Sequence, residues 1–137
     1  MWRLHLRRSV LLALALLCLG GALLAGPPPT AARSEAELRA FYQRACVGCH
    51  GLDGAAKGPD GKALKGRDLT ELGGPRGPSD QSLMKTIQGG LFFGLSMPAY
   101  RQELTEEETL HLVRSILRKA RKGEPIQVPS ELSASAR

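Results

Sequence analysis

The sequence predicts an all-α domain of three to four short helices joined by loops rich in glycine and proline. Three segments place apolar residues at helical spacing behind a capping residue, and the 137 residues include 16 glycines and 9 prolines that limit the length of each element. Aromatic residues make up only 4% of the chain, which is few for a domain that fills its core with side chains alone. We therefore expect something other than the polypeptide to complete the core.

The first 32 residues have the composition of a secretory signal. Three arginines and no acidic residue accompany an apolar run over residues 10–25, which is followed by a glycine and three prolines. The small residues Thr30-Ala31-Ala32 favour cleavage after Ala32, and cleavage after Ala25 is the second option. An uncleaved membrane anchor is the remaining alternative, although the apolar run is slightly short for a bilayer span.

Removal of this segment changes the charge of the chain. The full sequence carries 19 basic and 13 acidic side chains, a formal net charge of +6. Three of the basic residues and none of the acidic ones lie in residues 1–32, so the remainder carries 16 and 13, or about +3. The basic balance is thus largely a property of the export signal and says little about partners.

A helix is predicted from residue 34, because Ser34 and Glu37 form a capping box. The apolar residues of one helical face then follow at i, i+3, i+4 and i+7 spacing, namely Leu38, Phe41, Tyr42 and Ala45. This helix leads directly into Cys46.

The segment Cys46-Val47-Gly48-Cys49-His50 is the most specific motif of the chain. Two thiols at this spacing add across the two vinyl groups of haem, and the imidazole of the next residue ligates the iron. A thioredoxin-like redox pair and half of a zinc site are the alternatives. The first needs a βαβ context that this strand-poor sequence lacks, and the second needs further ligands, for which residues 33–137 offer only one other histidine, His111. The motif therefore predicts one covalently bound haem c per chain.

Two further helices and a tail complete the predicted domain. The first covers residues 79–90, with a capping serine at its start and two glycines at its end. The second begins at Thr105, where Glu108 completes a capping box, and continues to about residue 122. Residues 123–137 contain two prolines and a Ser/Ala end and are expected to form a loose tail.

A second axial ligand to the iron has three candidates after residue 32. His111 lies on the polar side of the predicted last helix, and Met84 has the spacing of a core residue in the helix before it. Met97 lies outside any periodic pattern, and Pro98 holds the backbone before it in an extended loop. Met97 is therefore the best candidate.

Residues 33–122 resemble a class I, His/Met-ligated monohaem cytochrome c of the small bacterial type. Besides the haem motif, the resemblance rests on Tyr42, Asp53-Gly54, Gly58-Pro59, Asp68-Leu69-Thr70, Gly89-Gly90, Met97-Pro98-Ala99-Tyr100 and the closing helix. It implies thioether bonds from Cys46 and Cys49, axial ligation by His50 and Met97, and a hydrogen bond from the His50 imidazole to the Pro59 carbonyl. It also implies a crossing of the first and last helices, where Leu112 departs from an aromatic that the family often has.

The resemblance implies a periplasmic one-electron carrier, exported by the general secretory route, that serves redox partner proteins as a monomer and is not itself an enzyme. One alternative is a haem-bearing subunit or domain of a larger respiratory or dehydrogenase complex, anchored in the inner membrane and facing the periplasm if residues 1–32 are uncleaved. Another is a gas-binding or peroxidatic haem protein, which requires Met97 to be off the iron. No nucleic-acid partner is expected, because the chain is exported and its aromatics are committed to core or haem. The cations that could dock an acidic partner, or simply form a solvated surface, are Lys57, Lys62, Lys65, Arg67 and Lys85.

Overall fold

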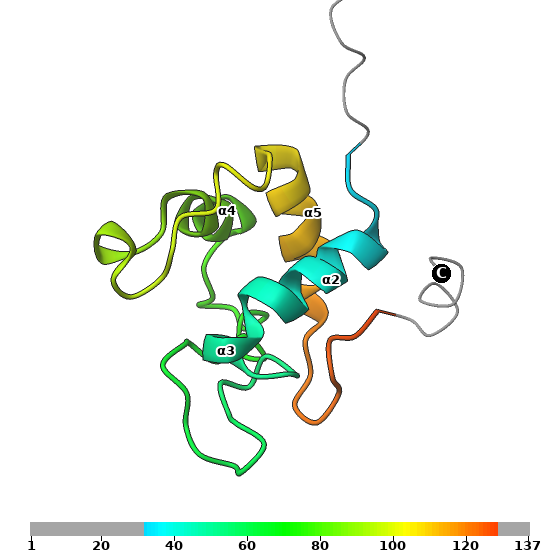
Figure 1. Ribbon diagram of the computed structural model, residues 1–137, viewed down its shortest axis with the longest axis vertical. Helices are drawn as coiled ribbons and strands as arrows, with labels where there is room; N and C mark the ends of the chain where they lie inside the picture. Colours follow the sequence, from blue (N-terminus) through cyan, green and yellow to red (C-terminus); the bar gives the residue numbers. More distant parts are fainter. Residues whose placement is uncertain (1–31, 129–137) are drawn as a thin grey trace, which may run out of the picture. The chain divides into compact units, whose positions relative to one another are not determined.

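The computed structural model describes residues 32–128, and these residues form a helical domain. Its α-helices are α2 (Glu35–Ala45), α3 (Val47–His50), α4 (Asp80–Gly89) and α5 (Glu106–Ser115), with short 3-10 helices η2 (Phe92–Gly94) and η3 (Leu117–Lys119) (Figure 1). Within this range extended pairing is limited to isolated bridges, so the all-α prediction is confirmed. No helix in the described part of the chain is long and apolar enough to span a bilayer. The predicted signal, up to residue 31, lies outside the described residues.

The three longer helices begin where their caps predict. The Ser34 hydroxyl accepts from the Glu37 N–H while the Glu37 carboxylate accepts from the Ser34 N–H, and Thr105 and Glu108 form the same reciprocal box at α5. Ser79 caps α4 by accepting from a main-chain N–H of its first turn. Each cap satisfies a donor that the helix itself leaves free, which fixes the starting residue.

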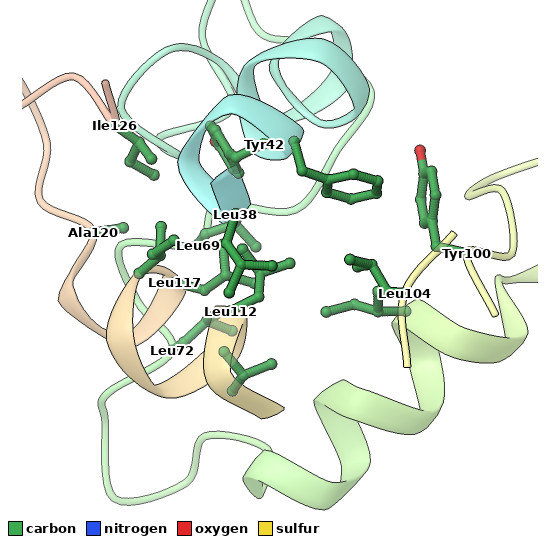
Figure 2. Close-up of a cluster of buried hydrophobic side chains, with 14 residues drawn as sticks. Leu38, Tyr42, Leu69, Leu72, Tyr100, Leu104, Leu112, Leu117, Ala120 and Ile126 are labelled. Carbon is green, nitrogen blue, oxygen red and sulfur yellow. The ribbon is translucent and has the colours of Figure 1, made fainter. Parts of the chain in front are cut away.

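The core lies where α2 crosses α5, with α4 packed against α5 on another side (Figure 1). Leu38 and Tyr42 of α2 and Leu112 of α5 are at most 1% exposed, and Figure 2 shows them in one apolar cluster. The crossing predicted for the first and last helices is thus confirmed. The Tyr42 hydroxyl donates to the Gly51 carbonyl at 2.8 Å, so a core residue also fixes the turn after α3.

The last helix is shorter than predicted. It ends at Ser115, because Ile116 has φ −121° and ψ −63°, and the chain continues as η3. The break places the Leu117 side chain in the core. It also lets the Arg118 guanidinium donate hydrogen bonds to the carbonyls of Leu72 and Pro78 and to the Asp80 carboxylate. These contacts fix the loop between α3 and α4. Their free energy outweighs the helical propensity of the residues after Ser115, for which the sequence pattern predicted a continued helix.

We expect Arg118→Lys to lower the free energy of unfolding by about 1–2 kcal/mol, because lysine keeps the charge but lacks the planar fork that serves two carbonyls and a carboxylate at once. Chemical denaturation of the protein measures this change. Arg114→Lys is the matched control, since Arg114 pairs with the same Asp80 but leaves 59% of its side chain exposed, against 23% for Arg118. Equal losses in the two variants would contradict the role of the Arg118 fork.

The segment after η3 is docked, which corrects the prediction of a loose tail from residue 123. Ile126 is 4% exposed and its N–H donates to the Leu52 carbonyl at 2.8 Å. The Gly123 N–H donates to the Asp53 carboxylate at 2.7 Å, and this bond is the main reason that the pKa of Asp53 is lowered. The Gln43 side chain also donates to the Ile126 carbonyl at 3.4 Å. Burial of Ile126 and these three long-range hydrogen bonds hold residues 123–128 against the domain, whereas residues 129–137 lie outside the described range.

Candidate functional site

The Cys46-to-His50 motif folds as a continuation of α2. The Cys46 N–H donates to the Tyr42 carbonyl at 2.8 Å and the His50 N–H donates to the Cys46 carbonyl at 2.9 Å, so α3 follows α2 with one residue between them. Gly51 then ends α3 with φ +79°, and a Cβ at this position would lie 2.7 Å from the Lys57 carbonyl oxygen. The backbone therefore holds the two thiols and the imidazole on a single turn.

Cys46, Cys49 and His50 line a largely apolar cavity of about 400 Å³. The loop after α3, helix α4, the loop after α4, and η3 provide its other walls. The apolar side chains of the lining include Leu69, Leu72, Leu83, Ile87, Leu91 and Leu117. Met97, Lys65 and Arg67 line the same cavity.

The imidazole of His50 is oriented by the carbonyl of Arg67, which lies 2.8 Å from Nδ1. A carbonyl oxygen only accepts hydrogen bonds, so Nδ1 carries the proton and Nε2 keeps its lone pair for a metal. The assignment of Pro59 to this role is corrected: Pro59 is exposed and lines a separate hollow beside Val47 and Gly48. The carbonyl that contacts His50 therefore belongs to a residue eight positions later in the chain than Pro59.

Gly66 brings the Arg67 carbonyl into place. Its N–H donates to the Cys49 carbonyl at 2.8 Å. A Cβ on Gly66 would lie 2.4 Å from that carbonyl oxygen and 2.7 Å from Nδ1 of His50. The sequence did not single out this role of Gly66 and Arg67, because nothing local distinguishes Gly66 from the other glycines of the same loop.

Met97 is half-buried at the cavity and is fixed through its main chain. The Leu91 N–H donates to the Met97 carbonyl at 2.9 Å, and Gly90 packs so closely that a Cβ there would lie 2.6 Å from the same oxygen. Met84 is buried in the core and His111 is exposed on α5, and neither lines the cavity. The structure therefore brings only Met97, of these three candidates, to the cavity that His50 lines.

The environment of the thiols argues against the two alternative uses of the motif. Burial, with a further contribution from Cys49, raises the pKa of the Cys46 thiol to about 12, whereas a redox-active dithiol needs a lowered pKa. Residues 32–128 contain no group of three or more His, Cys, Asp or Glu side chains that could hold a metal ion. Within this part of the chain, a zinc site at the motif would therefore lack its further ligands.

Two aromatic residues point to solvent, which corrects the expectation that all aromatics serve the core or the cofactor. Phe92 is 73% exposed and Phe93 is fully exposed, on the loop beside the cavity that forms the short helix at the left of Figure 1. Both have positive φ, +48° and +56°. The left-handed backbone of these two residues turns their rings outward, and the bridge between Leu91 and Met97 closes the base of the loop.

We expect Phe93→Asn to raise the free energy of unfolding by about 0.5–1 kcal/mol, because a left-handed backbone is costly for phenylalanine and tolerated by asparagine. Thermal unfolding of the haem-loaded protein measures the gain. Leu95→Asn is the control, since Leu95 is 90% exposed and has an ordinary φ of −70°. The expectation fails if Leu95→Asn stabilises the protein as much as Phe93→Asn.

The basic residues considered for docking are distributed over different parts of the surface. Lys65 and Arg67 line the cavity, Lys57 lines the hollow beside Pro59, and Lys62 pairs with Asp60 at 3.1 Å. Lys85 is exposed on α4 and does not line the cavity. Of these five residues, only Lys65 and Arg67 are placed to face acidic groups of a ligand in the cavity.

The residues of this cavity fit a haem. The two thiols can take its vinyl groups, the imidazole and thioether can ligate iron, the apolar walls can cover the macrocycle, and two cations can face its propionates. A small helical domain with this site is a monohaem c-type cytochrome.

Comparisons with known proteins lead to the same class of protein. Residues 33–114 match the family described as cytochrome C oxidase, cbb3-type, subunit III. The chain is also 34% identical over 110 residues to cytochrome c55X of Paracoccus denitrificans (strain Pd 1222), a match that covers 78% of this chain and 93% of the relative. The chain therefore belongs to the monohaem c-type cytochromes: it binds haem c covalently and transfers electrons to and from redox partners.

Proposed function

We propose that this protein is a periplasmic one-electron carrier whose haem is attached through Cys46 and Cys49 and whose iron is ligated by His50 and Met97. The observation that carries the proposal is that these four side chains line one cavity. The hydrogen bond from His50 to Arg67 supports it further, since it leaves Nε2 free to bind iron.

The ligand set explains why electron transfer is the favoured chemistry. When bound, the haem supplies an iron that changes oxidation state by one electron, and two protein ligands leave it no open position for a substrate. The soft thioether of Met97 favours the ferrous state and raises the potential. Main-chain bonds at Leu91 and Gly66 hold both ligating segments in place, so little rearrangement accompanies each transfer.

Met97→Ala is expected to abolish the far-red sulfur-to-iron band of the ferric protein while the haem stays covalently attached. Carbon monoxide should then bind the ferrous variant and not the natural protein. Met84→Ala is the matched control: Met84 is 5% exposed and does not line the cavity, so its loss should lower the stability by about 2–5 kcal/mol and leave the band unchanged. A natural protein without the band, or a Met97→Ala variant that retains it, would overturn the ligation.

A second candidate function is that of a haem-bearing subunit of a larger complex. The description of the matching family as a subunit of an oxidase favours it. Size-exclusion chromatography of the protein from its native membranes and soluble fraction separates the two functions. A free carrier elutes at the mass of one chain with one haem, whereas a subunit elutes with its complex.

Export is proposed by the general secretory route, because a chain that lacks the haem lacks part of its core and should cross the membrane unfolded. Retention of residues 1–32 as an inner-membrane anchor is the alternative. Fractionation of cells into periplasm and membranes decides between a released and an anchored protein.

A further inference from the structure

Arg33 is held by Glu108 through both its main chain and its side chain. The Arg33 main-chain N donates to Oε1 of Glu108 at 3.1 Å, and its guanidinium donates to Oε2 at 3.2 Å and to the Glu103 carbonyl. Glu108 is only 8% exposed. A residue near the start of the described range thus contacts a nearly buried carboxylate that lies 75 positions later in the sequence.

The capping role of Glu108 does not account for this contact. The Thr105 N–H donates to Oε2 of Glu108 at 2.9 Å, which completes the box at the start of α5. Oε1 is not needed by the box, and it faces the Arg33 main-chain N. Within residues 32–128, the equivalent glutamate of the other box, Glu37 in α2, makes no such second contact, and its Oε2 accepts from Ser34 alone.

The surroundings of the Arg33 nitrogen are negative. Glu108 contacts it directly, and Glu37 is close enough to feel the charges of both Arg33 and Glu108. Two further acids, Glu106 and Glu107, lie in the same first turn of α5. The Arg33 guanidinium is the only cation that the contacts around Glu108 bring to this carboxylate within residues 32–128. A second positive charge at the main-chain nitrogen would therefore be stabilised.

The peptide bond before Arg33 is the one that the sequence favours for cleavage, since Thr30-Ala31-Ala32 precede it. We propose that a signal peptidase hydrolyses the Ala32–Arg33 bond and that Glu108 binds the α-ammonium group so created. Water supplies the oxygen that completes the Ala32 carboxylate, and its two protons convert the former amide nitrogen of Arg33 into the ammonium group. This proposal rests on export of the chain, and it is independent of how the iron is ligated.

Cleavage replaces an amide donor by a charged one, and charge-assisted hydrogen bonds are the stronger kind. Burial tends to raise the pKa of Glu108, but the hydrogen bonds from Thr105 and Arg33 and the charge of Arg33 outweigh it and lower the pKa, so the carboxylate stays ionised at neutral pH. An amine paired with this carboxylate has a raised pKa in the folded state. The stabilisation from this pair is therefore fully present at a pH below the α-amine pKa of the unfolded chain, about 8, and is lost as pH rises through the higher α-amine pKa of the folded state.

The first test is the intact mass of the haem-loaded protein exported from the full-length chain. We expect residues 33–137 plus one haem. A chain that begins at residue 26, or that retains residues 1–32, overturns the proposal. If the chain begins at Arg33 and the far-red band is absent, the proposed ligation fails and this proposal stands.

The second test is the pKa of the Arg33 α-amine, measured by NMR titration of arginine-labelled protein. Glu108→Gln should lower this pKa by about 0.5 or more, because it removes the paired charge, while glutamine still completes a capping box and keeps the fold. Glu37→Gln is the matched control, since it makes the same change in the other capping box without touching the Arg33 nitrogen, and should have a smaller effect. An α-amine pKa that is equal in the natural protein and in Glu108→Gln overturns the proposal.

Discussion

The double variant Cys46→Ser/Cys49→Ser is expected to lose covalent haem and, with it, cooperative unfolding. The cavity that these thiols line measures about 400 Å³. Without the cofactor the apolar walls of this cavity are exposed to water, at a cost of about 1.5–3 kcal/mol for each large apolar side chain that loses its cover. The loss of several such contacts is comparable with the entire stability of a small domain, which is about 5–15 kcal/mol. The chain without haem should therefore retain helices but lack fixed packing.

Haem staining after denaturing electrophoresis, near-ultraviolet circular dichroism and calorimetry measure these effects. Gly48→Ala is the matched control, because it lies between the two thiols and a Cβ there meets nothing within 4 Å. It should keep the haem and a sharp transition. A sharp calorimetric transition in the double variant near the temperature of the natural protein would show that the haem contributes little to the core.

Gly66→Ala is expected to lower the free energy of unfolding by about 3 kcal/mol and to disturb His50, the proposed iron ligand. The added Cβ would meet the Cys49 carbonyl oxygen at 2.4 Å and Nδ1 of His50 at 2.7 Å. Neither the Cys49 main chain nor the hydrogen-bonded His50 ring can move aside as the end of a flexible side chain can. The segment around Gly66 must therefore shift, and this shift takes the Arg67 carbonyl away from Nδ1 of His50.

A purely structural role for Gly66 would change stability alone, so the reduction potential supplies the second measurement. The hydrogen bond to Arg67 increases the electron donation of the imidazole, and its loss should raise the potential. Gly73→Ala is the control, since a Cβ there meets nothing within 4 Å. A Gly66→Ala protein with the potential of the natural protein would show that Gly66 packs the loop without orienting His50.

Local signals in the sequence determined much of this protein. The side chain of a capping residue accepts a hydrogen bond from the main-chain N–H three positions later. Ser34, Ser79 and Thr105 were therefore enough to predict where α2, α4 and α5 begin. The haem motif needs its residues on one turn of backbone, and adjacency in the sequence guarantees that arrangement. The proline after Met97 likewise acts on its immediate neighbour.

The remaining features depend on contacts between residues far apart in the chain. Arg67 rather than Pro59 meets His50 because Gly66 lets the loop lie flat on Cys49. The last helix ends at Ser115 because Arg118 finds acceptors about 40 residues earlier.

The helix starts, the covalent haem motif and the candidate ligands can be predicted from the sequence, since each is encoded within a few neighbouring residues. The carbonyl that orients His50, the end of α5 and the docking of residues 123–128 emerge only when the chain is folded. A hydrogen-bond acceptor or a buried contact from a distant segment leaves no periodic pattern in the sequence, and its free energy of about 1 kcal/mol or more per contact is enough to override local propensity.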